Sequence, residues 1–173
     1  MNKLGQLTIA EACIDDAPIL LALMQAAFEE YEGILTPPSG AHNETVDTVR
    51  ARLAAGAAAL ARVGEDAAGF TFYEPAGDLV YLGRLSVLPR LRNNGIGGAL
   101  VAYVERRAKE KGAAGMRLGV RLQLPHLVAR YERLGYRITR YMTHRGYDQP
   151  TWVYMEKRWP EEFADSQTRR LED

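Results

Sequence analysis

The chain has 173 residues, of which 47% are hydrophobic, with 22 basic and 22 acidic side chains. This length suits one domain with a buried core, and the balanced charge argues against general binding of nucleic acid or a membrane surface. Cys13 is the single cysteine, so the chain cannot form an internal disulfide, and we expect Cys13 to be a small buried apolar residue. No spacing of Cys and His residues indicates a metal site.

The first predicted elements follow from hydrophobic periodicity and turn residues. A strand over Leu7–Ala12 precedes a helix that Asp15 or Asp16 caps and Gly33 ends. A second helix begins at Asn43 or Thr45. Three predicted strands follow: Ala57–Val63, Ala68–Tyr73 and Leu79–Val87. The first two are joined as a hairpin at residues 64–66, and a turn at 74–78 precedes the third.

The second half of the chain alternates helices and strands. An amphipathic helix starts near Ile96 and is capped by Gly112, and a short helix runs from Pro125 to Gly135. The predicted strands are Met116–Leu122, Tyr136–Thr143 and Trp152–Lys157. This order predicts an α+β fold with a mixed sheet, as one domain over residues 1–160 with a polar tail over 161–173. No segment resembles a signal peptide or a membrane span, so we expect a cytoplasmic protein.

The most informative segment is the turn between the strand ending at Val87 and the helix starting at Ile96. It is basic and rich in glycine, and helix N-termini of this kind attract phosphate groups. A nucleotide P-loop would need Lys-Ser/Thr where Gly98-Ala99 stands, and a dinucleotide fingerprint would need glycine at Leu100. A tight turn without a ligand is the remaining alternative.

Two motifs resolve these alternatives. The pattern Arg92-x-x-Gly95-x-Gly97, with Leu85-x-Val87-x-Pro89 before it, resembles the acetyl-CoA signature of the GNAT superfamily of N-acetyltransferases. Further along, the segment 131–136, Tyr-Glu-Arg-Leu-Gly-Tyr, is similar to that family's Tyr-Glu-Lys-x-Gly-Phe segment.

The resemblance implies a fold and a cosubstrate. The fold would be a three-layer α/β/α arrangement, with about four helices and a mostly antiparallel mixed sheet of about seven strands that splays at its central parallel pair. The cosubstrate would be acetyl-CoA, with the pantetheine arm pairing with the backbone of Leu85, Ser86 and Val87. The residues implied to bind the pyrophosphate, mainly through backbone N–H groups, are Arg92, Asn93, Asn94, Gly95, Ile96, Gly97 and Gly98. The side chains of Arg90 and Arg92 could neutralise further phosphate charge.

The resemblance also implies catalytic groups. Tyr131 stands where the family has the acid that protonates the departing CoA thiolate, although a core tyrosine is the alternative. The family's usual strand carboxylate is replaced by Gly83-Arg84, and an arginine cannot serve as the base. His144 is our first candidate base because imidazole titrates near neutrality; an exposed loop histidine is its alternative, and the glutamates at 29, 30 and 32 are alternative bases.

The acceptor side carries further expectations. Arg84 could clamp a substrate carboxylate, and we also assign Glu32 to substrate binding. Leu124 occupies the place of a family asparagine, so Gln123 or His126 would have to substitute for it. The predicted reaction is acetyl transfer to a primary amine of a small, amino-acid-like molecule. The alternatives are transfer to a protein or peptide and a non-catalytic acyl-CoA sensor, and the resemblance also allows a homodimer.

Overall fold

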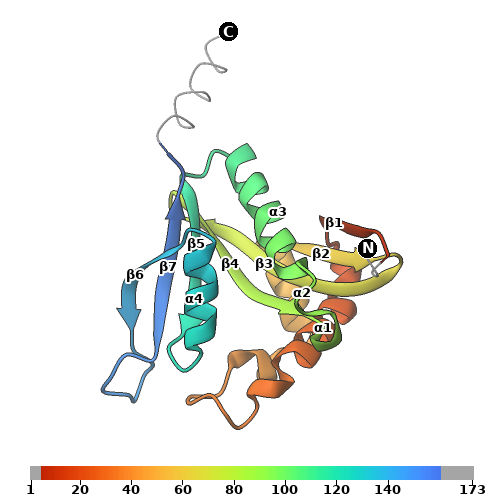
Figure 1. The fold of residues 1–173 in the computed structure, drawn as a ribbon. Helices are drawn as coiled ribbons and strands as arrows, with labels where there is room; N and C mark the ends of the chain where they lie inside the picture. Colours follow the sequence, from red (N-terminus) through yellow and green to blue (C-terminus); the bar gives the residue numbers. More distant parts are fainter. Residues whose placement is uncertain (1–4, 161–173) are drawn as a thin grey trace. The chain divides into compact units, whose positions relative to one another are not determined.

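The structure is a computed structural model, and it describes residues 5–160 (Figure 1). Seven strands form a mixed sheet in the order β1-β2-β3-β4-β5-β7-β6, with a parallel pair at its centre. The strands are β1 (Leu7–Glu11), β2 (Ala57–Val63), β3 (Asp66–Ala76), β4 (Leu79–Val87), β5 (Gly115–Arg121), β6 (Arg137–Met142) and β7 (Trp152–Arg158). The four α-helices of the described residues are α1 (Ala17–Phe28), α2 (Val46–Ala55), α3 (Ile96–Glu110) and α4 (Pro125–Arg133). The α+β class and the mixed sheet predicted from the sequence are confirmed.

Most predicted boundaries agree with the structure to within a few residues, and one strand is clearly longer. We predicted Ala68–Tyr73, whereas β3 runs from Asp66 to Ala76. The turn that follows contains only two residues, and Gly77 adopts a φ of 65°, which glycine tolerates without strain. Because the turns at both ends of β3 are tight, the strand is longer than predicted and continues through Pro75, where the sequence had predicted a turn.

The described residues divide into two compact units. The first contains residues 5–74 and 82–104, and the second contains 75–81 and 105–160. The prediction of one domain over residues 1–160 stays a prediction, and the tail predicted over 161–173 lies outside the described residues. Among residues 5–160, no helix is long and apolar enough to cross a membrane.

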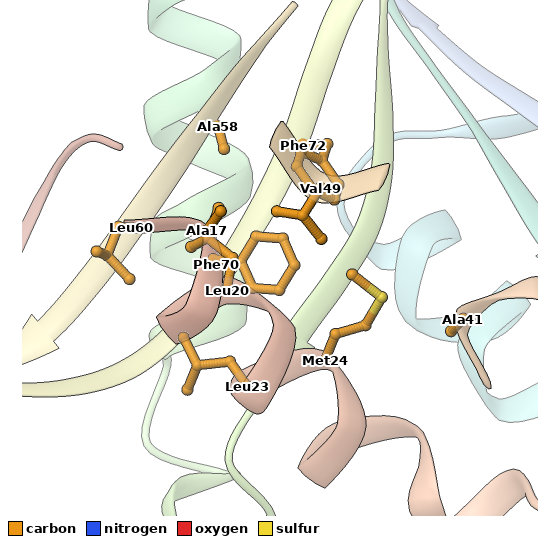
Figure 2. Close-up of a cluster of buried hydrophobic side chains, with 10 residues drawn as sticks. All are labelled: Ala17, Leu20, Leu23, Met24, Ala41, Val49, Ala58, Leu60, Phe70 and Phe72. Atoms are coloured by element: carbon orange, nitrogen blue, oxygen red, sulfur yellow. The ribbon is translucent and has the colours of Figure 1, made fainter. Parts of the chain in front are cut away.

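The core of the first unit lies between two helices and the sheet (Figure 2). Leu20 and Met24 of α1 and Val49 of α2 are fully buried against Phe70 of β3. Strand β2 is rich in alanine, with Ala58 fully buried in the same cluster, so the small side chains let the helices approach the sheet closely. Burying each large apolar side chain contributes about 1.5–3 kcal/mol, which fixes the helices that precede the candidate site.

The expectation for Cys13 was wrong. Its thiol is exposed rather than buried, because the residue lies at the junction between β1 and a short 3₁₀ helix (Ile14–Asp16). There the backbone of Cys13 is engaged instead: its N–H donates to the carboxylate of Asp16 over 2.8 Å. The junction is therefore stabilised by a local cap and not by burial of the cysteine.

The second unit is built on β5, β7 and β6, which pair in antiparallel fashion. Leu118, Val153 and Met155 are buried on one face, and the intervening residues of β7 are half-exposed on the other. Helix α4 is amphipathic, contacts β5 and buries Tyr131. This unit thus has one face in its core and one face that retains solvent contact.

Candidate active site

The glycine turn of the first unit is held by its own residues. A 3₁₀ turn (Pro89–Leu91) follows β4, and the side-chain amide of Asn94 donates to the carbonyls of Leu91 and Arg92 over 3.0 and 3.1 Å. Two residues are left-handed, Asn93 with φ 63° and Gly95 with φ 80°. These conformations favour asparagine and glycine, so the residue types seen in the sequence are those that the turn requires.

Helix α3 begins directly after this turn. The N–H of Ala99 donates to the carbonyl of Gly95 over 2.9 Å, which is a first bond of the helical pattern. The N–H groups of Ile96, Gly97 and Gly98 belong to the first turn and have no acceptor within the helix. Together with the positive end of the helix dipole, they make the start of α3 chemically suited to a phosphate group.

The side chain of Arg92 points back to the end of α1. Its Nη1 atom lies 2.6 Å from a carboxylate oxygen of Glu30, and its Nη2 atom donates to the carbonyl of Ala27 over 3.0 Å. A cation is favourable at this carbonyl because the C-terminal end of a helix carries partial negative charge. The guanidinium therefore fastens the turn to the C-terminal end of α1. Its predicted role in neutralising phosphate charge stays a prediction.

Strand β3 closely approaches β4, the strand that precedes the glycine turn. A Cβ atom added to Gly69 would lie 2.6 Å from the carbonyl oxygen of Ser86, so only glycine fits there. Ser86 is buried and donates from its hydroxyl to the carbonyl of Arg84 over 2.8 Å. Arg84 itself has a φ of 54°, which is rare for a non-glycine residue in a strand and marks a local irregularity such as a bulge. Leu85 and Val87, the other two residues predicted for the pantetheine arm, are partly buried.

Arg84 has an acidic neighbour that sequence reasoning missed. Its Nη2 atom lies 3.7 Å from a carboxylate oxygen of Glu44, and the Nε atom of Arg52 lies 3.8 Å from the same oxygen. The side chain of Glu44 is only 11% exposed. A Cβ atom on Gly40 would be 2.9 Å from Nη2 of Arg84, so the loop before α2 closes directly over the guanidinium. In the chain, this carboxylate is separated from the strand of Arg84 by one helix and two strands, and no local pattern could have linked the two residues.

The remaining acceptor-side predictions fall on exposed residues. Glu32 is exposed just after the 3₁₀ turn Glu29–Tyr31. Gln123 and His126 are also exposed at the start of α4, where Leu124 occupies the N-cap position. In the part of the chain that the structure describes, no group of three His, Cys, Asp or Glu residues could hold a metal ion.

Tyr131 is fixed in the second unit by packing. It is 8% exposed on α4, and its ring meets that of Tyr136 edge to face, with centroids 5.8 Å apart. Gly135, with φ 95°, ends the helix and turns the chain so that the N–H of Tyr136 donates to the carbonyl of Tyr131 over 3.0 Å. Burial, followed by the neighbouring carboxylate of Glu105, raises the pKa of Tyr136. The hydroxyl of Tyr136 donates to the carboxylate of Glu105 over 3.1 Å.

His144 lies in the segment between β6 and β7, also in the second unit. Its Nδ1 atom shares a hydrogen bond with the hydroxyl of Thr151, which also accepts from the backbone N–H of His144 over 3.1 Å. Burial, and then the positive charge of Arg121, lowers the pKa of the imidazole from its usual 6.5. The ring is consequently neutral at pH 7, with its orientation held by Thr151.

These observations can be set beside known proteins. Residues 20–136 match the model of the "Acetyltransferase (GNAT) family". No curated protein sequence matches the chain.

Solved structures resemble the fold over most of its length. The PaiA N-acetyltransferase from Thermoplasma acidophilum in complex with coenzyme A has a TM-score of 0.75 at 19% identity, covering 89% of this chain and 99% of that one. Ard1 from Thermoplasma volcanium has a TM-score of 0.73 at 19% identity, covering 90% and 99%. The ribosomal-protein-S18-alanine N-acetyltransferase from Escherichia coli has a TM-score of 0.71 at 20% identity, covering 88% and 94%.

The family match spans more than half of the chain and includes both the glycine turn and the 131–136 segment that carried the resemblance. The chain belongs to the acetyltransferase (GNAT) family and is an enzyme of that class.

Proposed function

We propose that the protein transfers the acetyl group of acetyl-CoA directly to a primary amine of a small molecule. The observation that carries this proposal is the turn built by left-handed Asn93 and Gly95, which leads into the start of α3, where the first N–H groups have no acceptor within the helix. The family match and the coenzyme A bound to the PaiA N-acetyltransferase support acetyl-CoA as the cosubstrate.

The cosubstrate is bound mainly by backbone groups in this proposal. The N–H groups of residues 92–98 hold the pyrophosphate, and glycine at 95, 97 and 98 lets its oxygens approach closely. The backbone of residues 85–87 pairs with the pantetheine arm, and the N–H of Val87 polarises the thioester carbonyl. Arg92 acts as a positioning residue, because its side chain is engaged with Glu30 and Ala27.

The chemistry needs one base and one acid. His144 takes the proton of the acceptor ammonium, and the free amine then attacks the thioester carbonyl to form a tetrahedral intermediate. As this intermediate collapses, the carbon–sulfur bond breaks and Tyr131 donates its hydroxyl proton to the departing CoA thiolate. The products are the acetylated amine and CoA.

The surroundings of Arg84 favour an amino-acid-like acceptor. Arg84 and Glu44 place a cation and a carboxylate 3.7 Å apart, beside the loop at Gly40. A zwitterionic amino acid carries the complementary pair, so its carboxylate can bind Arg84 while its ammonium binds Glu44. Glu32, exposed at the end of the preceding 3₁₀ turn, is assigned to the outer part of the same acceptor site.

The proposal is tested by following CoA release with a thiol reagent. The purified protein is given acetyl-CoA with small primary amines, free amino acids and short peptides in parallel. We expect turnover with small amines and none with peptides. Turnover with peptides alone would establish protein acetylation instead, and binding of acetyl-CoA without transfer to any amine would establish a non-catalytic sensor.

The pH dependence should identify His144 as the base. The pKa of His144 is lowered from 6.5 by burial and by Arg121, so the neutral form persists below that pH. We expect kcat/KM to stay level down to a pH below 6.5 and then to fall as the ring becomes protonated. His144→Gln should lower kcat/KM at pH 7 by about 100-fold and abolish this acid limb. An unchanged acid limb in the variant would assign the base to another group.

A further inference from the structure

One residue of strand β4 has a backbone conformation that its side chain disfavours. Arg84 adopts a φ of 54°, in the left-handed region that residues with a Cβ atom rarely occupy. Such conformations cost free energy, persist only where the surrounding structure imposes them, and cluster at functional sites. Neighbouring groups must therefore hold the backbone of Arg84 in place.

Two buried hydroxyl groups bind the peptide carbonyls on either side of Arg84. The hydroxyl of Thr71, on the neighbouring strand β3, donates to the carbonyl of Gly83 over 3.0 Å. The carbonyl of Phe72 is also within reach of this hydroxyl, at the longer distance of 3.2 Å. The hydroxyl of Ser86 donates to the carbonyl of Arg84 itself over 2.8 Å. Because the φ and ψ angles of Arg84 set the relative orientation of these two carbonyls, the two hydrogen bonds together fix its conformation.

The two hydroxyls lie where an apolar side chain would otherwise be expected. Thr71 is fully buried, and valine is β-branched in the same way without the hydroxyl. Ser86 is only 1% exposed. A buried hydroxyl lowers stability unless it is hydrogen-bonded, so both residues depend on the carbonyls that flank Arg84.

The conformation of Arg84 decides where its guanidinium lies. At a φ of 54° the side chain reaches Glu44, with Nη2 3.7 Å from a carboxylate oxygen, beside the loop at Gly40. Glu44 is itself fixed, because the hydroxyl of Thr48 donates to its other carboxylate oxygen over 2.5 Å. An ordinary strand conformation has a φ of about −120° to −140°, which would point the Cα–Cβ bond of Arg84 in another direction. The guanidinium therefore stays beside Glu44 only while the backbone is left-handed.

The end of β4 is attached to β3 by a separate contact. The N–H of Leu88 donates to the carbonyl of Ala68 over 2.9 Å, directly after the residues 85–87 that are proposed to pair with pantetheine. This bond does not involve Thr71. Loss of the Thr71 hydroxyl should therefore displace Arg84 more than it displaces the segment 85–87.

We infer that Thr71 and Ser86 are positioning residues for the acceptor: their hydroxyls hold Arg84 in the left-handed conformation that directs its guanidinium to the acceptor carboxylate. The inference rests on the proposed function, in which Arg84 binds that carboxylate. It goes beyond that function because it assigns the selectivity for carboxylated amines to two buried hydroxyls that act through Arg84.

The backbone conformation is tested by NMR on protein labelled with ¹³C and ¹⁵N at arginine. The Cα and Cβ chemical shifts of Arg84, assigned from the signal that is lost in Arg84→Lys, report on its φ angle. We expect Thr71→Val to move these shifts toward values typical of a strand, and Thr71→Ser, which keeps the hydroxyl, to leave them near the wild-type values. Unmoved signals in Thr71→Val would overturn the inference, whatever the acceptor is. Should Thr71→Val fail to fold, Ser86→Ala gives the same test at the second carbonyl.

The effect on selectivity is measured with pairs of amines that differ only in the carboxylate. The pairs are L-leucine with 3-methylbutylamine, and L-phenylalanine with 2-phenylethylamine. For the wild type we expect kcat/KM to be about tenfold higher for the amino acid of each pair. Thr71→Val should lose this preference through an amino-acid KM raised about tenfold, while the KM for acetyl-CoA and kcat/KM for the amines change less than about twofold. Thr71→Ser should keep the preference.

Tyr136→Phe is the matched control, because it removes a buried hydroxyl whose hydrogen bond to Glu105 lies in the second unit. It should leave the ratio of kcat/KM within each pair unchanged. If Thr71→Val lowers kcat/KM equally for an amino acid and its amine, the hydroxyl has only a structural role and the inference fails. A wild-type enzyme without preference for the amino acids would also overturn it and leave acetyl transfer intact. Failure to acetylate any small amine would instead overturn the proposed function, and the NMR signals of Arg84 would still decide whether Thr71 holds its backbone.

Discussion

Replacing Tyr131 with phenylalanine is expected to lower kcat by about 100-fold or more while acetyl-CoA affinity changes little. The substitution removes the proton donor proposed for the CoA thiolate and keeps the ring that packs against Tyr136 at 5.8 Å. Since the thiolate then leaves without protonation, the breakdown of the tetrahedral intermediate becomes the slow step. Single-turnover measurements of kcat and calorimetric titration with CoA separate the two quantities.

Tyr136→Phe is the control for this experiment. Tyr136 is also a buried tyrosine, and its hydroxyl is bonded to Glu105, which Lys157 approaches within 3.1 Å. Removing that hydroxyl should lower the free energy of unfolding by about 1 kcal/mol and leave kcat nearly unchanged. Comparable kcat values for Tyr131→Phe and the wild type would contradict the acid role and make Tyr131 a packing residue.

Replacing Gly98 with glutamate is expected to weaken CoA binding by about 100-fold, which corresponds to about 2.7 kcal/mol. A Cβ atom at Gly98 meets nothing within 4 Å, so the side chain fits without displacing the protein. Its carboxylate would instead occupy the space in which the pyrophosphate is proposed to bind, and would repel the phosphate charge. Calorimetric titration with CoA measures the loss.

The stability of the Gly98→Glu variant should not fall with its affinity for CoA. A carboxylate in the first turn of a helix interacts favourably with the helix dipole, by about 0.3–1 kcal/mol, and replacing a helical glycine stabilises the helix by about 0.5–1 kcal/mol. Gly98→Glu should therefore unfold at a temperature no lower than that of the wild type. Gly98→Ala, which adds no charge, should gain stability and lose at most about tenfold in affinity. Unaltered CoA binding by Gly98→Glu would mean that the pyrophosphate binds elsewhere.

Local patterns in the sequence were sufficient to predict the elements of the fold. Strands β2 and β4 agree with the predicted ranges because alternation and the flanking turn residues act over a few positions. Gly95, Gly112 and Gly135 have positive φ values at the turns where the sequence placed them. The error at Cys13 shows the limit of such patterns, since residue type indicates average burial and not the position of one junction.

The site was predictable to the extent that its motifs are continuous in the chain. The glycine turn is one segment, and its neighbours along the chain hold it, as the bonds from Asn94 show. The roles assigned to residues 85–87, 92–98, Tyr131 and His144 stay predictions, as do the homodimer and the acceptor contact at Glu32. The family relationship itself is confirmed by the match over residues 20–136.

The sequence by itself determined the fold class, the family and the phosphate-suited turn, because these depend on neighbouring residues and short periodicities. Only the tertiary structure decided that Arg92 binds Glu30 and Ala27, that Arg84 lies beside Glu44, and that Tyr81 joins the rings of β7. Those contacts join residues that are distant in the chain, and they depend on strand register and on how helices pack against the sheet. A charged or aromatic side chain carries no local signal of which distant partner it will meet. The turn could therefore be predicted from the sequence, whereas its anchor at Glu30 and the contact between Tyr81 and Tyr154 could not.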